Sequence, residues 1–218
     1  MRHSPPSSPP LIRCLLLLLL LPACGAAGAL RQATLVGQCA EGDAACSRRH
    51  PQAPIAVGTR FYPEVSAAID GSTTPTLALE SAAPDVLAVE GGALVARRPG
   101  TSAVLITTDD ASVVDFLHVW VAPVTSLTLM RRDGERVDGA IGLTVGEDVT
   151  IAPALWNRAQ RLSGAGDVAW TVSNEAAISV LRDGSPDRRR LRARAPGKAT
   201  VTVALGDVQA TVDVEVVP

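Results

Sequence analysis

The feature that most constrains the fold of this chain is an internal repeat. Short alternating stretches of Val, Ile, Leu and Thr begin at Ala53 and recur in a second copy. The matching segments are 55–58 and 143–146, 77–79 and 168–170, 87–89 and 178–180, 94–96 and 191–193, and 103–106 and 200–203. Each copy closes on an alternating stretch that ends in proline, at Pro123 and at Pro218. Such self-similarity predicts two domains of the same fold.

Each copy consists of short apolar–polar alternations separated by Gly, Pro and Asp, which is the pattern of β-strands joined by tight turns. Aromatic residues make up only 3% of the chain, so Val, Leu, Ile and Ala must fill the core. Two antiparallel sheets packed face to face bury one side of every such strand. We therefore predict an all-β chain with two tandem β-sandwiches, 53–123 and 124–218, the second enlarged by a hairpin insert at 182–190.

The second copy also resembles a known family. The stretches that carry the resemblance are 143–147, 170–174, 178–180, 191–203 and 212–216. Together they look like a bacterial immunoglobulin-like domain of group 2, a family found in intimin- and invasin-type adhesins and in many surface proteins. The resemblance implies an Ig-like sandwich with Trp170 in its core, and modules of this family serve as spacers, adhesins or sugar-binding units. In the first copy Leu79 stands at the tryptophan position, so that copy is assigned through the internal repeat.

The N-terminus has the form of an export signal. Arg2 and Arg13 precede an unbroken leucine run, 15–21, that ends in small residues. This run is well short of the ~20 apolar residues that span a bilayer. A plain signal peptide would be cleaved at an alanine within 23–29. The alternative is a lipoprotein signal, because residues 21–24, Leu-Pro-Ala-Cys, resemble a bacterial lipoprotein box.

The lipoprotein resemblance implies that residues 1–23 are removed and that Cys24 is diacylated as the first mature residue. Gly25, in place of Asp, would then favour the outer membrane. Residues 24–52 are expected to form the acylated cysteine and a flexible tether. Within this tether, Cys39 and Cys46 make an even pair that can form a disulfide in an oxidising compartment. A metal site that shares His50 is the less favoured alternative.

The charge balance excludes some classes of partner. The chain carries 20 basic and 22 acidic residues. Removing residues 1–23 takes away two arginines and no acidic residue, which leaves 18 basic and 22 acidic residues. A mildly acidic chain of this kind does not suit nucleic acid.

Catalytic signatures are missing from the sequence. It contains no Gly-x-Ser-x-Gly elbow and no His-Glu-x-x-His pair. His50 falls in the tether and His118 within a strand, with no shared site. We therefore expect no enzyme activity, no cofactor and no metal.

Two acidic clusters could either bind calcium or form ordinary turns. Asp109-Asp110 lies between two expected strands, and Asp133, Glu135 and Asp138 crowd a second turn. Clustered carboxylates at loops can bind calcium. Asp is also an ordinary turn residue, and neither cluster has the spacing of a dedicated calcium loop, so plain turns are favoured.

Two outward faces are candidate binding surfaces. Arg190, Arg192 and Arg194 should share the outer face of one strand, where they would hold phosphate or carboxylate groups or simply be solvated. In the closing strand of the first copy, Val114 and the set Phe116, His118 and Trp120 should project outward together. Either the chain itself covers this stripe, through 39–54 or the second sandwich, or it binds a partner.

These observations predict a non-catalytic, exported lipoprotein of the cell envelope. Its Ig-like domains would mediate adhesion, or binding to a surface glycan or an envelope protein, while the lipid at Cys24 holds it to the membrane. The alternative function is a passive spacer subunit of an envelope or secretion assembly.

Overall fold

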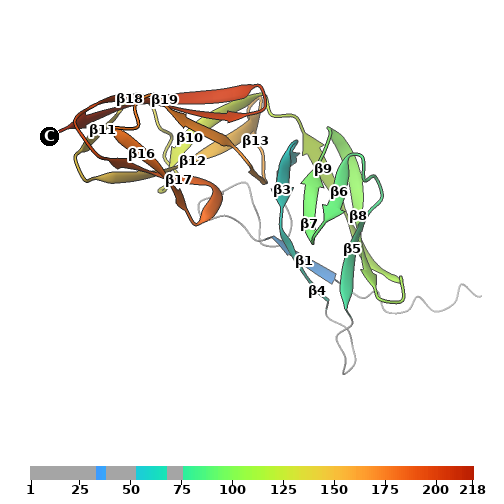
Figure 1. The fold of residues 1–218 in the computed structure, drawn as a ribbon. Coiled ribbons are helices and arrows are strands. Elements are labelled where there is room, and N and C mark those ends of the chain that lie inside the picture. Colours follow the sequence, from blue (N-terminus) through green and yellow to red (C-terminus); the bar gives the residue numbers. More distant parts are fainter. Residues whose placement is uncertain (1–32, 38–52, 68–75) are drawn as a thin grey trace, which may run out of the picture. The chain divides into compact units, whose positions relative to one another are not determined.

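The computed structural model describes residues 33–37, 53–67 and 76–218 (Figure 1). Strands β1 to β19 and the turns between them account for these described ranges, which contain no helix. No helix able to cross a membrane is therefore found among the described residues. The prediction of an all-β chain is confirmed.

The second sandwich consists of two four-stranded paths that face each other across a core. The first runs in the order β10 (Ser126–Arg131), β12 (Asp148–Asn157), β17 (Ser185–Ala193), β16 (Ile178–Asp183), with β13 (Gln160–Arg161) also paired to β12. The second runs in the order β11 (Ile141–Thr144), β19 (Val208–Val217), β18 (Gly197–Leu205), β15 (Ala169–Val172). The edge strand β11 pairs parallel to β19, whereas the other pairs within these sheets are antiparallel.

The first sandwich repeats this arrangement. Its two sheets run in the orders β2 (Ile55–Ala56), β9 (Val113–Ala122), β8 (Gly100–Thr108), β5 (Leu77–Ser81) and β14 (Ala165–Gly166), β3 (Thr59–Phe61), β7 (Ala93–Ala96), β6 (Leu87–Glu90). Strand β2 pairs parallel to β9 as β11 does to β19. Strands at corresponding positions of the repeat are thus paired in the same order in both copies, apart from β14, which the second copy contributes.

Alternation along the strands explains both cores. In β19, Val212, Val214 and Val216 are buried, while the intervening side chains are exposed. The deepest positions of both sandwiches are aliphatic, and the fully buried ones include Leu87, Leu94, Val104, Ile151, Ile178, Leu191 and Val203. Each such side chain contributes roughly 1.5–3 kcal/mol by leaving water. Aliphatic burial of this kind suits a chain so poor in aromatic residues.

Trp170 and Leu79, the two residues expected at equivalent core positions, are only half-buried. Both pack against the edge of their own core cluster. The Trp170 side chain therefore lines the margin of the core, and the centre of the second sandwich is filled by smaller aliphatic residues.

One strand lies where the sequence predicts a tether. Residues Ala33–Gly37 form β1, which pairs antiparallel with β4 (Pro63–Ala67). In the second copy β10 pairs antiparallel with β12 in the corresponding way. The first copy of the repeat thus includes β1, so residues 33–37 of the stretch predicted as a flexible tether form a strand.

Candidate binding surface

Strand β9 carries aromatic side chains on the outer face of the first sandwich. The exposed fraction is 57% for Phe116 and 63% for Trp120, and His118 between them is also exposed. On the opposite face of the strand, Val119 and Val121 are buried. The structure therefore places Phe116, His118 and Trp120 together on one outward face, which we call the β9 face.

The β9 face continues onto its neighbouring strand. Phe116, His118 and Trp120 lie opposite Leu105, Ala103 and Thr101 of β8, in that order. Leu105 and Ala103 are half-buried and Thr101 is exposed. The Phe116 and His118 rings meet edge to face, with 5.6 Å between their centroids and 86° between their planes. A mostly apolar area thus extends over two paired strands.

Few charges interrupt this area. Glu80 of β5 lies opposite Leu105 and is exposed on the same side of the sheet. Asp115 points to the other side by alternation, and its Oδ1 accepts a hydrogen bond of 2.8 Å from the Phe116 amide. The strand pairs described above bring no Lys or Arg to this part of the described sheet.

A bulge changes the start of β9. Ile106 lies opposite Asp115, but the next residue, Thr107, lies opposite Val113. The extra residue on β9 reverses the alternation. As a result Val113 is 55% exposed and Val114 is half-buried, so the prediction that Val114 joins the outward stripe is wrong.

The three arginines of β17 and its end are placed as alternation predicts, but their charge is partly balanced. Leu191 and Ala193 are buried, whereas Arg192 and Arg194 are exposed and Arg190 is half-buried. The Arg190 Nε atom lies 3.8 Å from Asp148 Oδ2. Because Asp148 also lies opposite Arg192 across the strand pair, the outer face of β17 is a mixed-charge surface.

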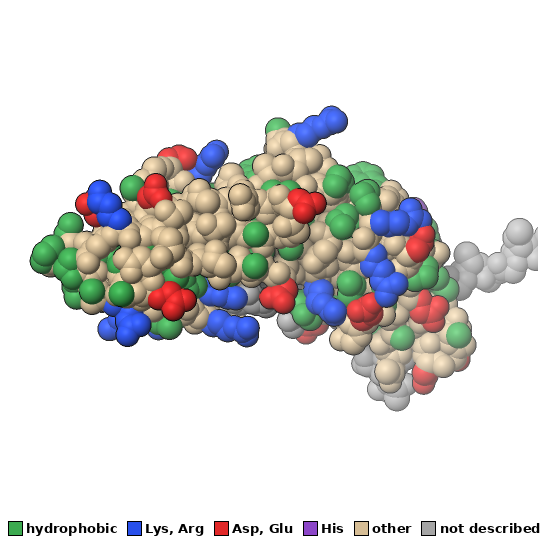
Figure 2. Space-filling view, turned by 45° about the horizontal axis from the view of Figure 1, so that its top comes forward, with side chains coloured by type: hydrophobic (Ala, Val, Ile, Leu, Met, Phe, Trp, Pro, Cys, Tyr) green, Lys and Arg blue, Asp and Glu red, His purple; other side chains and the backbone are tan. Residues whose placement is uncertain are grey.

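A mixed distribution of charge is visible more widely. On the face drawn in Figure 2, Lys and Arg side chains alternate with Asp and Glu side chains, without an extended area of a single sign. This view agrees with the near balance of acidic and basic residues in the sequence.

The acidic turn residues hold their own turns. Asp110 accepts hydrogen bonds from the Thr108 hydroxyl and, at 3.1 Å, from the Ser112 amide, and these bonds lower the pKa of Asp110. Asp133 accepts a bond of 3.0 Å from the Glu135 amide. Within the described ranges no three His, Cys, Asp or Glu side chains converge as a metal site. These hydrogen bonds support the turn interpretation for Asp110 and Asp133.

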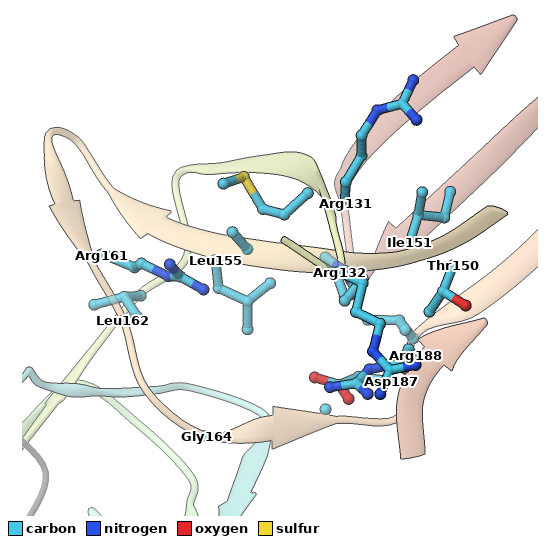
Figure 3. A pocket seen from close by; sticks show the side chains of 16 residues that line it. Arg131, Arg132, Thr150, Ile151, Leu155, Arg161, Leu162, Gly164, Asp187 and Arg188 are labelled. Carbon is cyan, nitrogen blue, oxygen red and sulfur yellow. The ribbon is translucent and has the colours of Figure 1, made fainter. Parts of the chain in front are cut away.

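A small cavity in the second sandwich was not anticipated from the sequence. Arg132, Arg188 and Asp187 lie together on one side of it and Arg161 on the other (Figure 3). The cavity holds only about 50 Å³, which is room for a few water molecules. These residues come from three separate segments of the chain, so no local pattern in the sequence could have indicated them.

Cys24, Cys39 and Cys46 lie outside the described residues. The lipidation of Cys24 and the pairing of Cys39 with Cys46 stay predictions.

Comparison with known proteins finds only distant similarity. No protein-family model matches the sequence, and no curated protein matches it. Among solved structures, domains 4 and 5 of the S-layer protein SbsC share 20% identity over 70% of this chain and 86% of that chain, with a TM-score of 0.33. The Escherichia coli adhesin FdeC shares 13% identity over 83% of this chain and 62% of that chain, with a TM-score of 0.32.

Invasin, described as a bacterial integrin-binding protein, shares 12% identity over 85% of this chain and 40% of that chain, with a TM-score of 0.34. The chain thus spans less than two thirds of the FdeC and invasin structures. At this level of similarity we infer neither a family nor a function from these proteins. The two sandwiches are established by the strand pairing of the chain itself.

Proposed function

We propose that this chain is an exported, non-catalytic binding protein of a bacterial cell envelope, and that the β9 face contacts a protein partner. The observation that carries the proposal is the exposure of Phe116 and Trp120 on the same face of strand β9, with His118 between them. Exposed apolar patches of monomeric proteins commonly mark interaction sites. Tryptophan is also among the residues that dominate the energy of protein interfaces.

The shape and chemistry of the β9 face favour a protein over a glycan. The face lies on a sheet. Its main contacts would be the Phe116 and Trp120 rings of β9 and the Leu105 side chain of the neighbouring strand β8. Protein interfaces have an apolar centre and a polar rim. Each aromatic side chain can bury ~150–250 Å², which would supply the centre of an interface that needs ~800 Å² per partner.

Export and anchoring are proposed from the N-terminal sequence. The basic start, the leucine run 15–21 and Cys24 directly after a small residue support a lipid anchor at that cysteine. We expect mass spectrometry of the mature protein from bacterial membranes to find diacylglycerol on Cys24. Recovery of unmodified protein that begins beyond Cys24 would disprove the anchor while leaving the β9 face untested by that result.

The test of the β9 face compares it with its counterpart in the second sandwich. We would introduce a photo-crosslinking residue at position 116 in intact cells, with and without Trp120→Ser, and at position 209 as the control. Gln209 is exposed on the matching strand of the other copy. We expect a discrete crosslinked protein from position 116 only, and loss of that product with Trp120→Ser.

Two other results have distinct meanings. If Phe116→Ser with Trp120→Ser markedly lowers the melting temperature of the purified chain, the β9 face is covered within the molecule. If stability and crosslinking are both unaffected, the proposed role in binding is wrong. We would then prefer the spacer function, because two tandem sandwiches of the same strand order can serve as a spacer without binding a partner.

A further inference from the structure

A groove of about 770 Å³ lies at one edge of the second sandwich. Strands β15 and β16 are the edge strands of the two facing sheets, and both contribute to the groove. Its charged and aromatic lining residues are Asp167, Trp170, Glu175, Arg182, Arg189 and Arg194. The volume is within the ~300–1,000 Å³ that small-molecule sites have. We call this site the edge groove.

Two arginines oppose each other in the edge groove. Arg182 of β16 and Arg189 of β17 are directly paired across the two strands. Alternation places Arg189 on the same side of β17 as the fully buried Leu191, and Arg189 itself is only 8% exposed. Like charges at directly opposed positions of a strand pair destabilise it. Burial and the charge of Arg182 lower the pKa of Arg189, whereas the charges of Asp187 and Asp167 raise it.

Trp170 makes one contact that favours stability, a cation–π contact with Arg189, and has one polar atom that does not. The Arg189 guanidinium lies over the Trp170 ring, 5.7 Å from its centroid. The Trp170 Nε1 atom is buried and has no hydrogen-bond partner among the described residues. A buried donor without an acceptor costs stability. Arrangements that break the rules of stable packing are typically retained where they serve a function.

The first sandwich shows that the fold does not require these residues. When the repeat is aligned through 87–89 and 178–180, Arg182 falls at Gly91. When it is aligned through 94–96 and 191–193, Arg189 falls at Gly92. These two glycines form the tight turn between β6 and β7, both with positive φ. The longer β16–β17 hairpin therefore adds the arginine pair to the same fold.

We propose that the edge groove binds an acidic saccharide. The carboxylate of the sugar would lie between Arg182 and Arg189, since guanidinium groups match carboxylates in geometry and charge. The sugar ring would pack on the accessible part of Trp170. Its hydroxyl groups would donate to Asp167 and Glu175, which also line the groove.

The carboxylates in the lining decide the class of ligand. Asp167 and Glu175 oppose the approach of a highly charged polyanion, whereas both accept hydrogen bonds from neutral hydroxyl groups. A ligand with one negative charge and several hydroxyl groups fits this combination of two acidic and three basic side chains. This proposal concerns a site separate from the β9 face and does not depend on it.

The experiment uses calorimetric titration of the mature chain with a trisaccharide of one galacturonic acid and two galactose units, which carries a single carboxylate. The neutral galactose trimer and inorganic phosphate are the comparison probes. Arg182→Gln should weaken binding of the acidic trimer at least about tenfold, because a hydrogen-bonded ion pair is lost. It should leave the melting temperature unchanged or raise it, because a like-charge contact is removed. Trp170→Leu, which installs the residue of the first copy, should also weaken binding.

Arg192→Gln is the matched control, since Arg192 is exposed on the outer face of the same strand pair. It should leave the affinity unchanged. The proposal is overturned if the acidic trimer fails to bind at millimolar concentration, if Arg192→Gln weakens binding as much as Arg182→Gln, or if the neutral trimer binds equally well. Equal affinity for inorganic phosphate would also overturn the saccharide assignment, because it would leave only a general anion site.

Discussion

The closing strands of the two sandwiches, β9 and β19, have the same place in the fold, but the side chains on their outer faces differ in chemical character. On the inner side, Val119 and Val121 of β9 correspond to Val214 and Val216 of β19, and all four are buried. On the outer side, β9 presents aromatic rings, whereas β19 presents the exposed residues Gln209, Thr211, Asp213 and Glu215. The inner face must pack in the core and is alike in both copies, so these two strands differ on the outer, solvent-facing side.

The hairpins β6–β7 and β16–β17 differ in the same way. Their buried residues correspond, as Leu87 does to Ile178 and Leu94 to Leu191. Only the second hairpin is long enough to extend past the core and to place charged side chains beside Trp170. Both comparisons indicate a common scaffold that carries a different candidate surface in each copy.

The largest expected effect tests whether the two cores are equivalent. Leu87 and Ile178 are both 0% exposed at matching positions of the repeat. We expect Leu87→Ala and Ile178→Ala each to lower the free energy of unfolding by about 2–5 kcal/mol, since each leaves a cavity in a packed core. Urea denaturation measures both. A variant that unfolds at the wild-type urea concentration would show that its sandwich does not share the common core.

A smaller effect distinguishes the two half-buried tryptophans of the second sandwich. Trp170 packs against the core cluster, whereas the Trp156 Nε1 atom donates a hydrogen bond of 2.8 Å to the Thr128 hydroxyl. Fully buried Trp→Ala changes cost ~3–5 kcal/mol. We expect Trp170→Ala to cost about 2–3 kcal/mol, below that range because the ring is only half-buried. Trp156→Ala should cost less, and an equal or larger loss for Trp156 in thermal melting would reverse the assignment.

Sequence periodicity was sufficient to assign residues to the inner or outer face wherever the strand alternates regularly. Counting back from Pro123 and Pro218 assigns Trp120 and Phe116 to the outer face and Val214 to the inner one, as the structure has them. The assignment of Val114 to the outer face was wrong. A bulge depends on the hydrogen bonds between β8 and β9, and the apolar–polar pattern of the sequence does not indicate it.

Features that depend on distant segments could not be predicted. Strand β1 has only five residues and becomes recognisable through its pairing with β4. The edge groove requires Trp170 of β15 to meet Arg182 and Arg189 across two sheets. Sequence spacing indicated that Arg190, Arg192 and Arg194 share a face, but it could not indicate that Asp148 from another strand lies beside Arg190.

The smallest expected effect concerns the turns that precede the two closing strands. In the first copy the turn before β9 contains Ala111 at a φ of 62°, and in the second copy the turn before β19 contains Gly206 at 56°. A left-handed conformation costs a residue with a Cβ atom ~1–2 kcal/mol, and glycine avoids this cost. We therefore expect Gly206→Ala to lower the free energy of unfolding by about 1 kcal/mol, because the open space around Gly206 leaves backbone strain as the only penalty. Ala111→Gly should raise stability by less than about 1 kcal/mol, since the gain in the turn is offset by the greater freedom of glycine in the unfolded chain. Thermal melting of the two single variants tests the pair, and changes of the same sign would show that the two hairpins do not impose the same backbone conformation.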